Sequence, residues 1–100
     1  RLLSQETVDR VFEQHTDGVD LVLGIPLRFG LGYAVSNPAS TPTIPEGRVG
    51  FWGGYGGSIV IADADRRMTF AYVMNRMSPG IIGSPRSEAY TRAVYSALEA

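Results

Sequence analysis

The order of apolar and polar residues predicts a short helix near the N-terminus. Ser4 is placed to cap it, because Glu6 follows in the first turn and Leu3 and Val8 have the spacing of a hydrophobic staple. Four residues at helical spacing form one face of this helix: Val8, Val11, Phe12 and His15. We expect the helix to end at the polar run 16–18, which places His15 near its C-terminus.

Two extended segments follow, at residues 20–23 and 27–35, and Gly24 and Pro26 lie between them. In the second segment Phe29, Leu31 and Tyr33 alternate with smaller or polar residues. Glycine inside a strand is typical either of a bulge or of close approach by another backbone or a ligand, and both readings stay open. Residues 36–47 contain three prolines and no periodicity, which predicts an exposed loop.

A hairpin is predicted from two apolar runs, 58–62 and 68–74, which are joined by the polar segment 63–67. Both runs are nearly continuous in apolar residues. An antiparallel strand with one wet face alternates instead, so this pattern indicates that both faces of the sheet are covered.

The C-terminal residues predict a second helix, capped by Ser84 and with Pro85 at its first position. We expect its apolar stripe to pack on the sheet, with Tyr90 and Tyr95 at the margins. That stripe comprises Ala89, Ala93, Val94, Ala97 and Leu98. The expected fold class is therefore α+β, an antiparallel sheet of three to four strands with an N-terminal and a C-terminal helix packed on it. One helix covers one face only, so further chain is expected on the other.

Composition removes several kinds of catalytic site. The chain has 100 residues, 44% of them apolar, with no cysteine and a single histidine, and all nine basic residues are arginines. Cysteine or histidine zinc clusters and a Ser-His-Asp triad cannot form within it. Without lysine there is no P-loop, no Schiff base and no Ser-x-x-Lys pair. We expect no metal and no organic cofactor.

Charge argues against two classes of partner. The net charge is −1 and the arginines are scattered along the chain, which does not favour nucleic acid or an anionic membrane surface. No apolar run approaches the roughly 18 residues of a membrane-spanning helix.

Six of the twelve glycines fall within residues 47–57, in a segment rich in aromatic residues. The spacing fits neither the dinucleotide pattern Gly-x-Gly-x-x-Gly nor Gly-x-Ser-x-Gly, since Val60 stands where the last glycine is required. A tight turn followed by a bulge is one explanation. The other is a strand edge stripped of side chains, where a backbone N–H approaches a substrate oxygen between the aromatic walls Trp52 and Tyr55, as in half an oxyanion hole.

This order of elements resembles the C-terminal end of serine β-lactamase-like hydrolases, specifically the family VIII carboxylesterases. The resemblance covers nearly the whole chain: residues 21–33, the glycine-rich strand, the hairpin ending in Tyr-Val-Met-Asn-Arg-Met at 72–77, and the Pro85-Arg86 helix start. The third motif of that family is Lys-Thr-Gly in penicillin-recognising enzymes and Trp-Gly-Gly or His-Gly-Gly in many esterases. Here it reads Trp52-Gly53-Gly54.

The resemblance implies that the backbone N–H of Tyr55 is a catalytic oxyanion-hole donor and that Trp52, Gly53 and Gly54 bind substrate. An indole offers an apolar wall where lysine would offer a charge, which favours short neutral esters, with weak β-lactam hydrolysis as the secondary alternative.

The family's Ser-x-x-Lys and tyrosine motifs match nothing in this chain. The resemblance therefore implies that residues 1–100 are the C-terminal segment of a larger domain, partnered by the rest of the parent chain and inactive alone. A noncatalytic relative and an independent binding module are the alternatives that the residues leave open.

Overall fold

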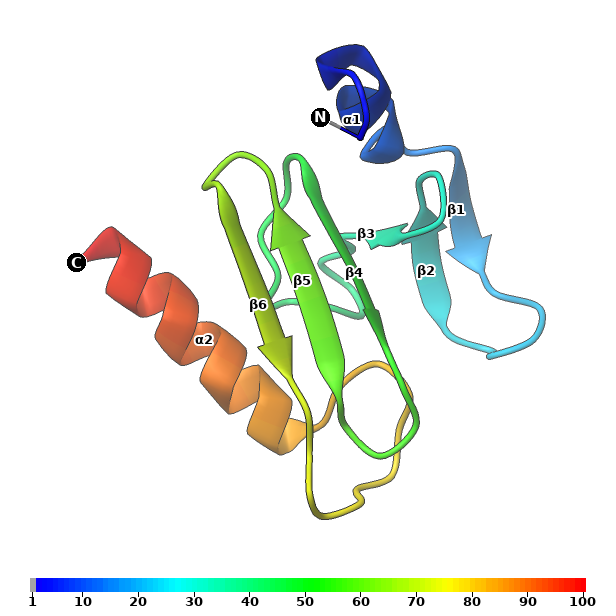
Figure 1. Ribbon diagram of the computed structural model, residues 1–100. Helices are drawn as coiled ribbons and strands as arrows, with labels where there is room; N and C mark the ends of the chain where they lie inside the picture. The colour runs from blue at the N-terminus through cyan, green and yellow to red at the C-terminus, as the bar shows by residue number, and fades with distance from the viewer. Residues whose placement is uncertain (1) are drawn as a thin grey trace.

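The computed structural model describes residues 2–100 and shows one antiparallel sheet with a helix at each end of the chain (Figure 1). In chain order the elements are α1 (Gln5–Val11), β1 (Thr16–Val19), β2 (Pro26–Phe29), β3 (Ala34–Val35), β4 (Val49–Gly53), β5 (Ile59–Asp63), β6 (Met68–Tyr72) and α2 (Pro85–Glu99). The six strands lie in the sheet in the same order as in the chain. The predicted α+β class is confirmed.

The sheet has six strands rather than the predicted three to four, because turns divide the extended segments differently. The carboxylate of Asp20 accepts hydrogen bonds from the N–H groups of Val22 and Leu23, at 3.0 and 2.7 Å. Residues 20–23, predicted as extended, therefore form the turn between β1 and β2. A second turn at Gly32, where φ is +81°, separates β2 from β3.

Helix α1 begins as predicted and ends early. The Ser4 side chain accepts a hydrogen bond from the Thr7 N–H at 3.1 Å, which confirms the cap. The Val11 carbonyl accepts from the Leu31 N–H at 3.1 Å, and the His15 N–H donates to the Phe29 carbonyl at 2.7 Å. These long-range bonds replace helical ones, so the prediction that the helix reaches 16–18 is wrong and His15 lies outside it, exposed.

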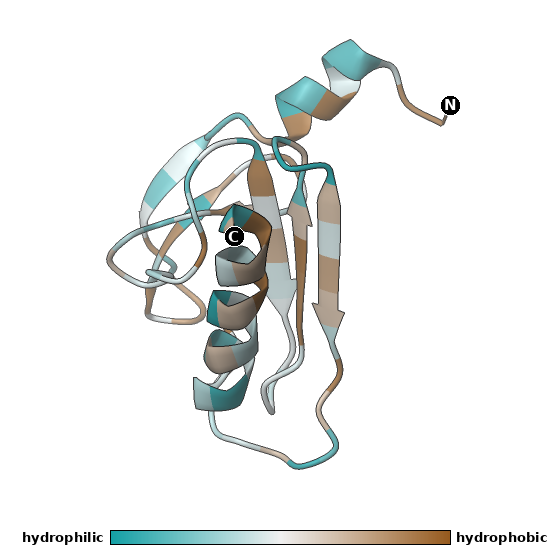
Figure 2. Cartoon of the chain, turned by 90° about the vertical axis from the view of Figure 1, so that its left-hand side faces the viewer, coloured by the Kyte–Doolittle hydropathy of each residue, from teal (hydrophilic) through white to brown (hydrophobic). Residues whose placement is uncertain are grey.

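Helix α2 lies across one face of the sheet (Figure 2). Its cap is confirmed, since Ser84 and Ser87 exchange side-chain to backbone hydrogen bonds and Pro85 opens the helix. The buried residues are Ser87, Thr91 and Tyr95, whereas Val94 is half-buried and the rest of the predicted stripe is exposed: Ala89, Ala93, Ala97 and Leu98. Small hydroxyl side chains let the helix approach the sheet, and the Thr91 hydroxyl donates to the Ser87 carbonyl at 2.7 Å.

The core lies between α2 and the sheet. Register sets Phe51 of β4 opposite Ile61 of β5, and Ile61 opposite Phe70 of β6, so these side chains share the face that α2 covers. The core comprises Ala34, Ile44, Val49, Phe51, Ile59 and Ile61. The hairpin predicted at 58–62 and 68–74 is confirmed as β5 and β6.

Residues 36–47 contain no helix or strand, as predicted, but the loop is exposed only in part. Ser36, Asn37, Thr41 and Ile44 are buried. The Ser36 hydroxyl donates to the Ile44 carbonyl at 2.5 Å, so the loop is folded back on itself and places Ile44 in the core.

The second face of the sheet is covered at one end only. Phe12 and Tyr33 lie against Gly50, so close that a side chain there would be 3.1 Å from both. Towards the other end Val60, Ala71 and Val73 are exposed. Within residues 2–100 the prediction of two covered faces therefore holds fully for one face only.

In the described part of the chain no helix is long and apolar enough to cross a membrane.

Candidate functional site

The Trp52-Gly53 end of β4 forms a local sheet edge. β3 pairs with β4 only at Gly50 and Phe51. Trp52 and Gly53 pair with β5 on one side, opposite Val60 and Ile59, and within residues 2–100 no strand pairs with them on the other. The motif thus projects beyond β3, where a ligand can reach its backbone.

Tyr55 lies in the turn between β4 and β5, and its backbone N–H donates to no acceptor in the described part of the chain. Three neighbouring amides are used: Gly54 donates to the Ser58 carbonyl at 3.2 Å, Gly56 to the Gly80 carbonyl at 3.0 Å, and Gly57 to the Gly54 carbonyl at 3.3 Å. Among residues 2–100 the Tyr55 N–H has no acceptor, and the residue is 64% exposed. The Tyr55 amide is therefore an unused donor of this turn.

The fold does not require glycine equally at every position of the motif. A side chain at Gly53 would lie 2.6 Å from the Ile81 carbonyl oxygen, and one at Gly57, where φ is +118°, would lie 2.8 Å from the Ser84 hydroxyl. At Gly54 a side chain would meet nothing within 4 Å, and φ lies outside the left-handed range. The fold therefore requires Gly53 and Gly57, whereas the space beside Gly54 is open to a ligand.

Trp52 points to the face of the sheet that α2 does not cover, because side chains alternate along a strand and Phe51 faces the core. Its ring packs on that of Phe29, with the centroids 5.6 Å apart and the planes tilted by 41°. Beside it the sheet face has a shallow hollow of about 270 Å³, lined with mostly apolar side chains that include Val60, Ala71 and Val73. Trp52 thus forms an apolar wall between this hollow and the free edge of the motif.

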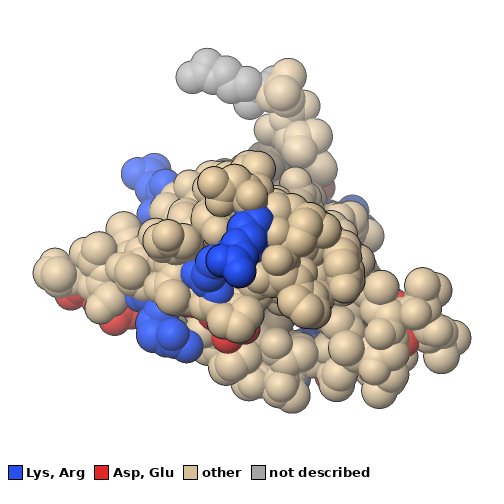
Figure 3. Space-filling model, turned by 90° about the horizontal axis from the view of Figure 1, so that it is seen from below, with Lys and Arg blue, Asp and Glu red and all other residues tan. Residues whose placement is uncertain are grey.

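The two segments around the motif contain no acidic side chain. Residues 53–58 and 73–84 contain no Asp or Glu, and Arg76 lies in the second of these segments. Figure 3 shows basic side chains near the middle of this end of the molecule. Asp63 and Asp65 lie at the opposite end of the β5–β6 hairpin. These two segments therefore contribute no carboxylate that would repel negative charge on a ligand near Tyr55.

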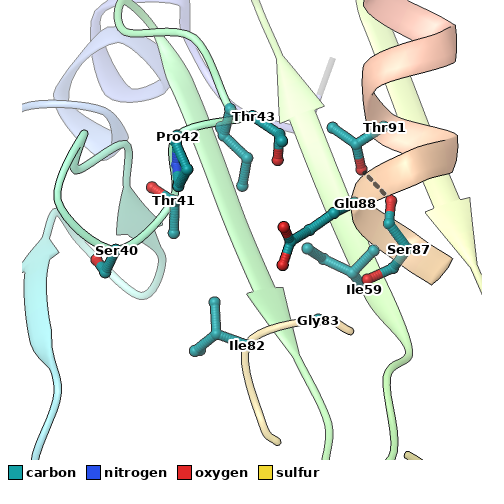
Figure 4. A pocket seen from close by; sticks show the side chains of 11 residues that line it. Ser40, Thr41, Pro42, Thr43, Ile59, Ile82, Gly83, Ser87, Glu88 and Thr91 are labelled. Carbon is teal, nitrogen blue, oxygen red and sulfur yellow. Dashed lines mark hydrogen bonds between the residues drawn. The ribbon is translucent and has the colours of Figure 1, made fainter. Parts of the chain in front are cut away.

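A second cleft separates residues 40–44 from the start of α2 (Figure 4). Its volume of about 20 Å³ is enough for one water molecule. The Thr91 and Ser87 hydroxyls beside it donate within α2, to the carbonyls of Ser87 and Ser84. In the described part of the chain no group of three or more His, Asp or Glu side chains is placed to hold a metal ion. The motif edge is thus the stronger candidate site.

Comparison with known proteins identifies the family. The family model described as Beta-lactamase matches residues 1–93. The chain belongs to the Beta-lactamase family. A penicillin-binding protein homolog from Caulobacter crescentus has a similar structure, with a TM-score of 0.85 and 30% identity over 96% of this chain. No curated protein matches this member of the Beta-lactamase family.

A second similar structure is a family VIII carboxylesterase, with a TM-score of 0.80 and 24% identity over 98% of this chain. At that identity the likeness shows the shared fold. In both comparisons the chain spans 26% of the length of the other protein. The predicted resemblance to β-lactamase-like hydrolases is confirmed, and the family is one of serine hydrolases.

The structure brings Trp52, Gly53, Gly54 and Tyr55 together along one strand end and turn, as the motif predicts. Sequence reasoning missed the residues that hold this turn in place. They come from residues 74–86 and comprise Met74, Met77, Ser78, Gly80 and Arg86. The Tyr-Val-Met-Asn-Arg-Met run was visible in the sequence, but its contacts with the turn depend on tertiary structure.

Proposed function

We propose that this chain is the C-terminal segment of a serine hydrolase, a carboxylesterase that acts on short neutral esters through an acyl-enzyme. Its contribution is the third motif and half of the oxyanion hole. The observation that carries this proposal is the free Tyr55 N–H, at the position of the motif that implies an oxyanion donor. Membership of the Beta-lactamase family supports the reaction class.

In the proposed reaction, a serine of the rest of the parent chain attacks the ester carbonyl carbon and gives its proton to a neighbouring base. The carbonyl π electrons move to oxygen, and the Tyr55 N–H donates a hydrogen bond to the resulting oxyanion. The intermediate then collapses: the C–O bond to the alkoxide breaks, the alkoxide takes the proton from the base and leaves as the alcohol, and an acyl-serine remains. Water attacks the acyl-serine in the same way and releases the carboxylic acid.

The nucleophile belongs outside residues 1–100 in this proposal, because the chain has no lysine for a Ser-x-x-Lys pair. Both similar structures are about four times as long as this chain, which supports the division. The exposed apolar residues Val60 and Val73 on the sheet face are in accord with further chain packing there. Residues 1–100 alone are accordingly expected to hydrolyse no ester.

Trp52 supports neutral esters as the substrate class. Its indole presents apolar surface and one N–H donor, whereas a lysine there would attract a substrate carboxylate. The open space beside Gly54 gives an ester room to approach the Tyr55 amide.

The test replaces the Tyr55 amide by an ester bond in the parent protein, using the matching hydroxy acid. Losing an oxyanion donor lowers kcat by about 10²–10³-fold, and we expect this loss with p-nitrophenyl acetate. Tyr55→Phe is the control and should stay within about two-fold, because the proposed role belongs to the backbone. An unchanged kcat in the ester-bond variant would overturn the assignment of Tyr55.

A further inference from the structure

The turn that carries Tyr55 is held by residues 73–84, which we call the clamp segment. At Gly56 the two backbones bond twice: the Gly56 N–H donates to the Gly80 carbonyl at 3.0 Å, and the Ser78 N–H donates to the Gly56 carbonyl at 2.9 Å. The Met74 N–H donates to the Ser58 hydroxyl at 3.3 Å. The clamp segment thus grips the turn on the C-terminal side of Tyr55.

Side chains of the clamp segment fill the space beside the same glycine. A side chain at Gly56 would lie 2.5 Å from the Met74 methyl carbon and 2.6 Å from the Met77 sulfur. Gly56 itself has φ of +115°, which disfavours any other residue there. Gly56 is thus the point where the clamp segment meets the turn, and it adjoins Tyr55 in the chain.

The clamp segment contains no helix or strand, so its own position needs an anchor. Arg86 provides it from the first turn of α2. Its Nη2 donates to the Arg76 carbonyl and to the Ser78 hydroxyl, the latter at 2.9 Å. Ser78 is therefore bonded at once to Arg86 through its side chain and to Gly56 through its backbone.

The surroundings of Arg86 set it apart from an ordinary surface arginine. Its Nε is buried and has no hydrogen-bond partner among residues 2–100, and no described carboxylate forms an ion pair with its guanidinium. Burying part of a guanidinium without a counter-charge is unfavourable in itself. Burial of the Arg86 guanidinium therefore costs free energy, and its hydrogen bonds hold the clamp segment against the Tyr55 turn.

We propose that Arg86 is a positioning residue for the oxyanion hole: through Ser78 and Gly56 it fixes the direction of the Tyr55 N–H. This inference rests on the proposed function. Oxyanion donors accelerate a reaction because they already point at the developing charge, and a displacement of about 1 Å costs up to about 10²-fold in rate. Arg86 does not touch the substrate in this scheme, and its effect is confined to the geometry of the donor.

Two variants of the parent protein test the proposal. Arg86→Met keeps the length of the side chain and removes the donors, and Arg86→Lys keeps a charge and one donor group. We expect Arg86→Met to lower kcat by about ten-fold or more with KM within about two-fold, and Arg86→Lys to recover part of the loss. Arg92→Met is the matched control, because Arg92 is an exposed arginine of the same helix.

A second readout does not depend on ester hydrolysis. Amide hydrogen exchange should become faster in the peptide covering residues 54–58 of Arg86→Met and stay unchanged in β5 and β6. Unchanged kcat and exchange would overturn the proposal, and so would a uniform rise in exchange over the whole chain, which indicates general destabilisation. If the parent protein lacks esterase activity, the proposed function fails, while faster exchange confined to 54–58 still supports the Arg86 link.

Discussion

The hydroxyl of Tyr95 donates a hydrogen bond to the carboxylate of Asp63 at 2.8 Å and so joins α2 to the end of β5. The Asp63 side chain is fully buried, and its charge is balanced by Arg66, whose guanidinium lies 3.1 Å away and 5.2 Å from the centre of the Tyr95 ring. Burial, and then the bond to Asp63, raise the pKa of Tyr95 well above the usual tyrosine range. The helix is thus fixed to the sheet by a polar contact inside the core.

Tyr95→Phe should destabilise the parent protein by about 2 kcal/mol at neutral pH, because the buried carboxylate loses a donor. Because the pKa of Tyr95 is raised in the folded state, its stabilising contribution is fully present below the unfolded pKa of about 10. The contribution is lost as the pH rises from there through the folded pKa. The difference between the two proteins should therefore be constant from about pH 7 to 9 and shrink above about pH 10.

Urea unfolding across this pH range measures the effect of Tyr95→Phe. Tyr90→Phe is the control, because Tyr90 lies on the same helix, is 52% exposed and contacts Tyr72 through its ring. Equal losses in the two variants would show that the bond to Asp63 contributes nothing specific.

Gly53→Ala and Gly54→Ala, adjacent and chemically identical changes, should act differently. A methyl group at Gly53 collides with the Ile81 carbonyl, so we expect a loss of about 1–3 kcal/mol in unfolding free energy. A methyl group at Gly54 meets nothing, so stability should stay within about 0.5 kcal/mol while kcat/KM for p-nitrophenyl acetate falls. Thermal unfolding and ester kinetics separate the two. A Gly54→Ala protein with unchanged kinetics would argue against substrate contact there.

In the proposed esterase, Trp52→Lys should shift the preference from neutral esters towards esters that carry a carboxylate, because it adds a positive charge beside the proposed oxyanion site. The measurement is the ratio of kcat/KM for a neutral ester and a carboxylate-bearing ester with the same leaving group. Trp52→Phe removes the indole without adding charge and should leave the ratio nearly unchanged. If Trp52→Lys leaves it unchanged too, the charge argument is refuted.

Features set by neighbouring residues could be predicted from the sequence. The caps at Ser4 and Ser84 depend on residues within one turn, and the β5–β6 hairpin depends on adjacent apolar runs, so local chemistry is sufficient. The end of α1 could not be predicted, because the Val11 carbonyl bonds to Leu31, twenty positions along the chain. The buried face of α2 was predicted wrongly for a similar reason. Its hydroxyl-bearing residues pack inward, and one of them, Tyr95, donates a hydrogen bond to Asp63, 32 positions away in the chain.

For the candidate site, too, some residues could be predicted from the sequence and others could not. Trp52 and Tyr55 could be located because the motif is contiguous and its glycines are conspicuous. The clamp segment could not, because Gly56 and Ser78 are 22 positions apart and neither residue type signals the other. Arg86 is further still from the turn, and only the folded chain shows that its guanidinium reaches Ser78.

The free N–H at Tyr55 has a consequence for how such a site can change over time. A donor that belongs to the main chain survives almost every substitution at its own position, whereas the tight contacts at Gly53 and Gly56 tolerate almost none. Descendants of one ancestor can therefore exchange the side chains at 52 and 55 while the main-chain amide at position 55, the donor in the proposed function, is inherited intact.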